Sequence, residues 1–358
     1  MLEAFLGEPQ HRENLTIFPI LAEEDRTLPY VLMADALATG FLTIGEKDGG
    51  QVPILLAENQ GGDPILIVDG EQLIGARQNR MTNRSILLAP KTTTEISVSC
   101  MEQGRWHFVG DQFSAAPQHA PSKVRRKARE TEEAASRAAD ARGPGVRASY
   151  RDLAAAQGEV WDEIQDLGDK LGGASATGAL DAIYGKRQQE MEDWQTAFPL
   201  LPRQVGLLAF TGPIPLGLDA LGSPSLFAKL HQRFLTGYVL DALEQGAGRG
   251  RRADRVRPGA PEPTGMAEAE AFVESMRRAE RAPSEPVGMG EYRILRGTAL
   301  GGELVNDDHL VHLSAFPTVE DRQSRGGRNQ ANSNGPNRPS ARPSAGPIAR
   351  PSRRRRRF

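Results

Sequence analysis

The segment that decides the fold reads Asp69-Gly70-Glu71-Gln72-Leu73-Ile74-Gly75-Ala76-Arg77-Gln78-Asn79-Arg80 and continues to Cys100, the single cysteine of the chain. The apolar run Pro64-Ile65-Leu66-Ile67-Val68 precedes it and is typical of a strand buried on both faces. Asp69-Gly70 then suits a tight hairpin that needs a positive φ. The segment ends in the strand-like stretch 95–101. It predicts a β-rich frame that carries a polar Gln-Asn-Arg cluster.

Short apolar runs broken by turn residues extend this pattern over residues 14–113 and predict further strands. A small helix or loop is expected at 31–39. The expected strands cover residues 15–21, 41–45, 52–57, 64–68, 85–89, 95–101 and 106–109. Beyond residue 120 the character changes. Residues 122–142 are rich in Ala, Arg and Glu with almost no large apolar side chains, which predicts a solvated or partly disordered helix.

The remaining segments predict further helices and a few closing strands. Residues 149–171 repeat apolar side chains every three or four positions, from Leu153 to Leu171, and 179–194 continue in the same way. A β element is expected at 205–218. Ser223-Pro224 opens a helix with an N-cap hydroxyl and a proline at its first position. A loop at 246–263, an amphipathic stretch at 266–281 and strands at 292–295, 304–305 and 310–316 complete the expected elements.

These segments together predict an α+β fold with an antiparallel β-rich core and inserted helices. We expect one domain over residues 1–317, β-rich at 14–113, helical at 122–198 and mixed at 203–317. Residues 318–358 consist almost entirely of Arg, Asn, Ser, Pro, Gly and Ala. Such a composition buries too little apolar surface to offset the entropy of ordering, so a disordered tail is expected there.

Composition and charge narrow the class of protein. The net charge is −2, but residues 322–358 hold eleven arginines and no acid, so the rest of the chain is strongly acidic. One cysteine excludes an intrachain disulfide and a four-thiolate zinc site. The sequence contains no apolar run of membrane length and no secretory leader pattern, which predicts a cytoplasmic protein. Metal-ligand spacings, phosphate-binding glycine loops and serine elbows are missing from it, so we assign no metal and leave the cofactor unassigned.

Four side chains are candidates for catalysis. Cys100 alternates with Ile96 and Val98, so it is either a small buried residue or a nucleophile that needs a base such as His107. Glu71 and Glu102 are an acid and a base, or solvated glutamates near turns. Asp219 follows an apolar strand and precedes a helix, where both functional acids and turn-capping aspartates occur. His312 is interpreted as a core or surface histidine rather than a metal ligand.

A second group of residues is expected to bind a ligand. Gln78, Asn79 and Arg80 form a cluster of amide and guanidinium donors, and Arg105 and Trp106 follow the last strand of the frame. A guanidinium bonds two oxygens at once, which suits carboxylate and phosphate groups. The alternative is that the cluster bonds to the protein's own backbone and positions a loop.

The chain resembles the ARG and rhodanese-phosphatase-superfamily-associated protein family, first type. The resemblance rests on the opening segment and on further blocks down to residue 316. These blocks are Ser97-Val98-Ser99-Cys100-Met101-Glu102-Gln103-Gly104-Arg105-Trp106, Gln157-Gly158-Glu159-Val160-Trp161, Val205-Gly206-Leu207-Leu208-Ala209, Gly217-Leu218-Asp219 and His312-Leu313-Ser314-Ala315-Phe316. The resemblance implies an association with ADP-ribosylglycohydrolases and rhodanese-phosphatases, and so with ADP-ribose or nucleotide-derived metabolism in a prokaryotic conflict or repair setting. It carries over no catalytic residue.

Three functional hypotheses follow. The leading one is an accessory domain that binds a nucleotide-like or ADP-ribose-related ligand through Gln78, Asn79 and Arg80. The second is an uncharacterised enzyme that uses Cys100 or Glu102, and the third is a protein-interaction scaffold. The arginine tail is expected either to bind nucleic acid weakly and without sequence preference, or to be a solvated extension. No membrane partner is expected.

Overall fold

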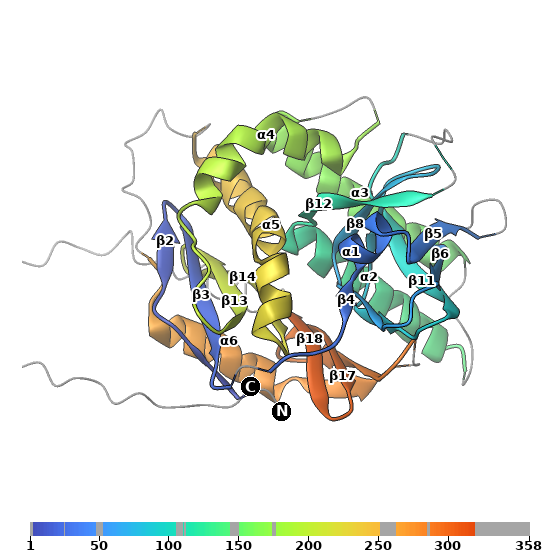
Figure 1. Cartoon of the computed structure of the whole chain (residues 1–358). Helices are drawn as coiled ribbons and strands as arrows, with labels where there is room; N and C mark the ends of the chain where they lie inside the picture. The colour runs from blue at the N-terminus through green and yellow to red at the C-terminus, as the bar shows by residue number, and fades with distance from the viewer. Residues whose placement is uncertain are drawn as a thin grey trace, which may run out of the picture.

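The computed structural model describes residues 3–24, 26–47, 53–104, 110, 112–143, 150–173, 177–250, 263–284 and 287–318. Antiparallel sheets and helices alternate along this part of the chain, which confirms the predicted α+β class (Figure 1). No helix within these ranges is long and apolar enough to cross a membrane.

The largest sheet combines strands from both ends of the described chain. Its order is β1-β3-β13-β14-β18-β17-β16-β15, with β2 paired to β3, and every pair in it is antiparallel. The N-terminal strand β3 therefore lies beside β13, as Figure 1 also shows. The strands are β1 (Ala4–Leu6), β2 (Gln10–Arg12), β3 (Leu15–Ala22), β13 (Gln204–Thr211), β14 (Ile214–Leu221), β15 (Glu280–Pro283), β16 (Glu291–Arg296), β17 (Leu300–Asn306) and β18 (His309–Phe316).

Two smaller sheets form the β-rich part predicted at 14–113. One has the order β12-β8-β9-β11-β6-β5, and the other has the order β10-β7-β4, in which β4 and β7 run parallel. Their elements are β4 (Val31–Leu32), α1 (Met33–Ala38), β5 (Leu42–Glu46), β6 (Ile54–Asn59), β7 (Ile65–Ile67), β8 (Glu71–Gly75), β9 (Arg80–Thr82), β10 (Ile86–Leu88), β11 (Thr92–Cys100) and β12 (Phe113–His119). Strand β12 was not predicted, and the expected strand at 106–109 lies outside the described residues.

The turn after β7 has the predicted conformation but not the predicted role. Gly70 has φ +87°, and the Glu71 N–H donates to the Val68 carbonyl at 3.1 Å. The hairpin prediction is wrong, because β7 pairs with β10 and β4 whereas β8 pairs with β9 and β12. The turn sends the chain from one sheet into another. A Cβ at Gly70 would also lie 2.6 Å from atoms of Arg125 and His119, so only glycine fits there.

Helices cover both faces of the large sheet. Side chains on β3 and β13 alternate between two cores: Ile17 and Leu207 pack in one with α5, while Phe18 and Phe210 pack in the other with α6. The ring of Phe272 on α6 meets that of Phe210 edge-on, at 6.4 Å between centroids. The helices are α2 (Ser122–Asp140), α3 (Tyr150–Leu171), α4 (Leu180–Gln195), α5 (Pro224–Gly250) and α6 (Met266–Arg278).

The N-terminal third shares a core with α5. Phe227 and Phe234 of α5 belong to the same buried cluster as Leu66 and Val68. The apolar face predicted for α3 is confirmed too, because its residues from Val160 to Leu171 join this cluster. The sheets and helices are thus joined by apolar packing as well as by chain connectivity.

Three helix predictions need correction. The segment at 122–142 is not a solvated helix, because Arg125, Arg126 and Arg129 of α2 are buried and bonded to carboxylates. Helix α5 continues through residues 246–250, where a loop was expected. The amphipathic stretch at 266–281 ends as a helix at Arg278 and continues into β15. The predicted tail beyond residue 318 lies outside the described residues.

Candidate functional site

Cys100 is buried, as its alternation with Ile96 and Val98 predicts. Its Sγ accepts a hydrogen bond from Nη1 of Arg80 at 2.9 Å. Burial raises the pKa of the thiol to about 11, in spite of the neighbouring Arg80 charge. The thiol is therefore protonated at neutral pH, which disfavours nucleophilic chemistry. His107, the base suggested by the sequence, lies outside the described residues.

The Gln78–Arg80 cluster bonds within the protein. Arg80 is fully buried, and its Nη1 also donates to Oε1 of Gln78 at 2.9 Å, while Nη2 lies 3.4 Å from Oε1 of Glu46. Asn79 accepts a hydrogen bond from the Gly75 N–H at 3.4 Å. The alternative of bonding to the protein's own backbone thus fits the Asn79 contact, whereas Arg80 bonds to side chains, and ligand contact by these residues stays a prediction. Arg105 and Trp106 lie outside the described residues.

Glu71 and Glu102 are both buried, so the reading of them as solvated glutamates is wrong. Oε2 of Glu71 accepts the Val68 N–H at 2.8 Å, and Oε1 lies 3.2 Å from Nη1 of Arg233. Burial raises the pKa of Glu71, and the Arg233 charge only partly offsets this. The turn at Gly70 places Glu71 at the start of β8, where its carboxylate lies beside Arg233 of α5.

Asp219 lies inside β14 and is fully buried, so it is not a turn-capping residue. Both its oxygens accept from Arg125 of α2, at 2.7 and 2.9 Å. The hydroxyl of Tyr238 on α5 donates to Oδ2 at 2.6 Å. Burial alone would raise the pKa of Asp219, but the charge and hydrogen bonds of Arg125 outweigh burial and hold it well below its usual range. Asp219 is thus a buried carboxylate that stays ionised.

Asp69 extends this ion-pair network towards the smaller sheets. It follows β7, and its Oδ2 accepts from Nη2 of Arg129 at 3.0 Å and from the Ser314 hydroxyl at 2.8 Å. Nε of Arg125 lies 3.5 Å from Oδ1. Burial opposes ionisation of Asp69, yet the charges of Arg129 and Arg125 lower its pKa. The network joins α2 and two sheets through paired charges.

Ser85, His312 and Asp219 form a chain of contacts within the network. Oγ of Ser85 lies 2.6 Å from Nδ1 of His312, whose Nε2 lies 3.4 Å from Oδ1 of Asp219. The same residue types perform acyl transfer in hydrolases. Here the Ser85 hydroxyl also accepts the Asp69 N–H at 2.9 Å and is 3 % exposed, so substrate has no route to it. We assign this chain a structural role.

The sequence identified Asp219 but missed its partners. Arg125 and Arg129 are four residues apart, which places both on one face of α2. Val124 and Ala128 accompany them in the apolar core, so a paired arginine stripe beside small apolar residues was the available signal. The residues that these two arginines and their carboxylate partners contact lie far away in the chain, at Asp69, in β14 and in β18.

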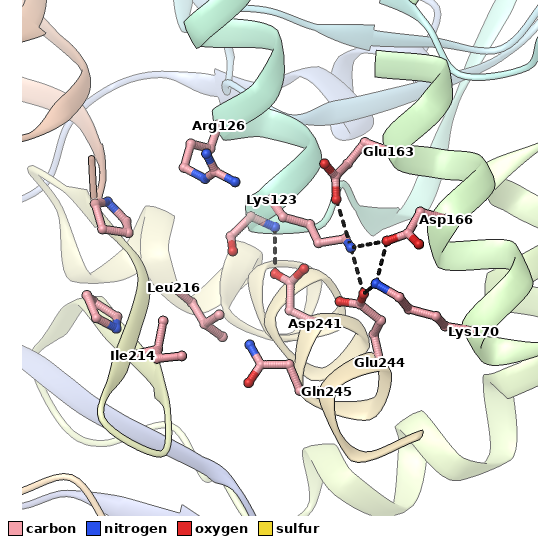
Figure 2. A pocket seen from close by; sticks show the side chains of 13 residues that line it. Lys123, Arg126, Glu163, Asp166, Lys170, Ile214, Leu216, Asp241, Glu244 and Gln245 are labelled. Carbon is pink, nitrogen blue, oxygen red and sulfur yellow. Dashed lines mark hydrogen bonds and ion pairs between the residues drawn. The ribbon is translucent and has the colours of Figure 1, made fainter. Parts of the chain in front are cut away.

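A mixed-charge pocket of about 330 Å³ lies between the start of α2, α3, β14 and α5 (Figure 2). We call it the mixed-charge pocket. Its walls carry three cationic side chains, four carboxylates and an apolar edge. The lining residues are Ser122, Lys123, Arg126, Glu163, Asp166, Lys170, Ile214, Pro215, Leu216, Asp241, Glu244, Gln245 and Pro317.

A second pocket of about 300 Å³ lies on another face of α3. We call it the Trp161 pocket. Nε1 of the half-buried Trp161 is itself buried and has no hydrogen-bond partner among the residues that the structure describes. The lining residues are Gln103, Gly104, Trp161, Ile164, Gln165, Gly168, Asp169, Gly173, Thr177, Gly178, Ala179 and Ile183.

Two of the sequence blocks quoted above meet beside the Trp161 pocket. Oε1 of Gln157 accepts the Cys100 N–H at 2.7 Å, and its Nε2 donates to the Cys100 carbonyl at 2.9 Å. This double hydrogen bond fixes the end of β11 against α3. It brings Gln103-Gly104 from one block to Trp161 from the other. Neither of the two pockets is lined by any of the four candidate catalytic residues, Glu71, Cys100, Glu102 and Asp219.

Comparison with known proteins identifies the family. The model of the ARG and Rhodanese-Phosphatase-superfamily-associated Protein domain (ARPP-1) matches residues 3–316. The chain belongs to this family. The match ends at the last residue of β18, so the ARPP-1 domain contains the ion-pair network and the Trp161 pocket, whereas the arginine-rich segment follows it. Searches of curated proteins and of solved structures found no match.

Within the described ranges of this ARPP-1 domain, no group of three or more His, Cys, Asp or Glu side chains is arranged to hold a metal ion.

Proposed function

We propose that this ARPP-1 domain is a ligand-binding accessory domain and that a nucleotide-like or ADP-ribose-related ligand binds in the Trp161 pocket. The observation that carries the proposal is the buried N–H of Trp161, which meets no acceptor in the described part of the chain and lies at the wall of a pocket of about 300 Å³. Small-molecule sites begin at about this volume. A buried donor without a partner costs about 1–3 kcal/mol, and a bound acceptor would recover this free energy.

The chemistry of the wall suits a heterocyclic base. An indole side chain supports stacking, which contributes about 1–3 kcal/mol per base in nucleic-acid complexes. Gln103 and Gln165 each carry an amide with both donors and acceptors, which is the combination that reads the edge of a base. The backbone at Gly104 and Gly168 has no side chain to obstruct a flat ligand. The lining therefore favours a planar ring with hydrogen-bonding edges.

The charge of the wall distinguishes parts of such a ligand. The described lining contains no lysine or arginine and one carboxylate, Asp169. A diphosphate would meet no counter-charge there, so we assign the base and ribose to this pocket. Arg105 follows Gly104 directly in the sequence and is the first cation that we propose for a phosphate group. The family's association with ADP-ribose metabolism adds support for this class of ligand.

The rival enzyme hypothesis has less support. The Cys100 thiol is protonated and buried, and Glu102 lines neither the mixed-charge pocket nor the Trp161 pocket. A binding domain needs only a pocket with suitable polar groups, and the Trp161 pocket has them.

Fluorescence titration tests the proposal on the full-length chain. Adenosine, ADP, ADP-ribose and NAD are added in turn while tryptophan emission is recorded. We expect saturable quenching with one or more of them, and its loss in Trp161→Phe. Asp162→Asn, an exposed neighbour on α3 that does not line the pocket, is the matched control and should bind normally. No saturable change with any of the four compounds would refute the proposal.

A further inference from the structure

The mixed-charge pocket contains one carboxylate more than it has cations. Lys123, Arg126 and Lys170 face Glu163, Asp166, Asp241 and Glu244. Figure 2 shows that these side chains come from three helices and meet around one space. The formal excess is one negative charge, which a single cationic group would balance.

The cations of the pocket already have partners. Nζ of Lys123 lies 2.8 Å from both Glu163 and Glu244, and Nζ of Lys170 lies 2.5 Å from Asp166 and 2.7 Å from Glu244. Arg126 donates to Glu130 within α2. Binding an anion would require these pairs to break, so the pocket is poorly suited to a phosphate or carboxylate ligand.

Asp241 is the acid whose charge is least compensated. It is 1 % exposed, and its Oδ2 accepts the Ser122 N–H at 2.8 Å. Oδ1 is buried and accepts no hydrogen bond from any side chain or backbone group within the described ranges. Figure 2 shows the carboxylate directed from α5 towards the start of α2, among the residues that line the pocket. Burial raises the pKa of Asp241 to about 6, although the Ser122 hydrogen bond and the Lys123 charge act against this. A carboxylate in this condition gains from a nearby cation.

The opposite edge of the pocket is apolar. Ile214, Pro215 and Leu216 at the start of β14 lie there, together with Pro317. A ligand with an aliphatic stem could rest against this edge and place its charged end near Asp241. Ammonium and guanidinium groups on short alkyl chains have this shape.

We propose that the mixed-charge pocket binds a single alkyl-guanidinium or alkyl-ammonium group, with Asp241 as its counter-charge. The proposal concerns a different pocket from the proposed nucleotide-like ligand and is independent of it. Two sources supply this chemistry. One is a free small amine or guanidine. The other is an arginine of residues 322–358, since this segment begins five residues after Pro317 at the pocket edge.

Isothermal titration with butylguanidinium tests the proposal, with uncharged butylurea as the matched probe. The proteins are the full-length chain, a full-length variant whose eleven tail arginines are replaced by glutamine (the tail variant), and the tail variant that also carries Asp241→Asn. Asp181→Asn removes an exposed acid outside the pocket and controls for overall charge. We expect butylguanidinium to bind the tail variant at least tenfold more tightly than butylurea, and Asp241→Asn to abolish that preference.

The wild-type chain then identifies the source. Affinity for butylguanidinium that is equal in wild type and tail variant assigns the site to a free ligand. Affinity at least tenfold weaker in wild type assigns it to the chain's own arginines. Thermal melting checks that each variant is folded. If the folded tail variant binds both probes alike, or if adding Asp241→Asn to the tail variant leaves its affinity for butylguanidinium unchanged, the proposal is wrong.

Discussion

The Arg125–Asp219 pair should contribute more to stability than any surface ion pair of the protein. Replacing Asp219 by Asn keeps the size of the side chain but leaves the Arg125 guanidinium buried without its bidentate partner. Removing one partner of a buried pair typically costs about 3–5 kcal/mol, because the remaining charge is uncompensated. Asp219 also accepts from Tyr238, so we expect Asp219→Asn to fall within this range.

Urea unfolding at pH 7.5, followed by circular dichroism, measures the free energy of unfolding. Asp35→Asn is the control, because Asp35 pairs with Lys229 at 2.8 Å where both side chains are more than half exposed. An exposed pair contributes about 0–1 kcal/mol. A double variant, Arg125→Met with Asp219→Leu, should lose less than the sum of the two single losses. If Asp219→Asn costs no more than Asp35→Asn, the network is not the structural element that we describe.

The pH dependence of this stability has a definite sign. The folded-state pKa of Asp219 is lowered, so its contribution is present above the unfolded value of about 3.8 and is lost as the pH falls below it. Asp69 acts in the same direction. Wild-type protein should therefore lose stability below about pH 4 more steeply than Asp219→Asn does.

Three further predictions test other parts of the description. Cys100 should resist iodoacetamide at pH 7.5 in the folded protein and react readily in urea, since burial keeps its thiol protonated; fast labelling of the folded chain would return support to the enzyme hypothesis. Burial and the Arg125 charge lower the pKa of His119 to about 3. Below the unfolded value of about 6.5 the unfolded chain takes up a proton that the folded chain does not, so the folded state loses stability as the pH falls. His119→Phe should then lose less stability than wild type as the pH falls from 6 to 4, and equal acid sensitivity would contradict this. We also propose that the arginine-rich segment binds nucleic acid weakly, with steep salt dependence and no base preference. Fluorescence polarisation at two salt concentrations should show binding that disappears when the eleven tail arginines become glutamine, and binding that persists would move the site to the rest of the chain.

The sequence pattern predicted the elements whose contacts lie nearby in the chain and those whose buried residues recur at a regular spacing. The alternation of Ile96, Val98 and Cys100 predicted their burial, and the spacing from Val160 to Leu171 predicted the apolar face of α3. The Asp69-Gly70 turn shows the limit of such reasoning. A turn signal gives the backbone conformation, but it does not say whether the strands on its two sides pair with each other.

The ion-pair network and the Trp161 pocket depend on contacts between residues far apart in the chain, which no local sequence pattern contains. Arg125 pairs with Asp219, which lies 94 positions away in the chain. Because Arg125 is buried, the polar composition of α2 wrongly indicated a solvated helix. Polar side chains look solvated in a sequence until their counter-charges are known. The Trp161 pocket combines Gln103-Gly104 with α3 and the start of α4, so the blocks that line it were visible in the sequence while their meeting was not.

We propose that a nucleotide-like ligand binds against Trp161. Fluorine NMR of full-length protein labelled with 5-fluorotryptophan tests it most directly, because the chain has three tryptophans, Trp106, Trp161 and Trp194. Trp161→Phe assigns one resonance, and Trp194, buried on α4 outside the pocket, serves as the internal reference. We predict that ADP-ribose or adenosine shifts the Trp161 resonance in a saturable manner and leaves that of Trp194 unchanged. A Trp161 resonance that stays in place at saturating concentrations of both compounds would contradict the proposed site.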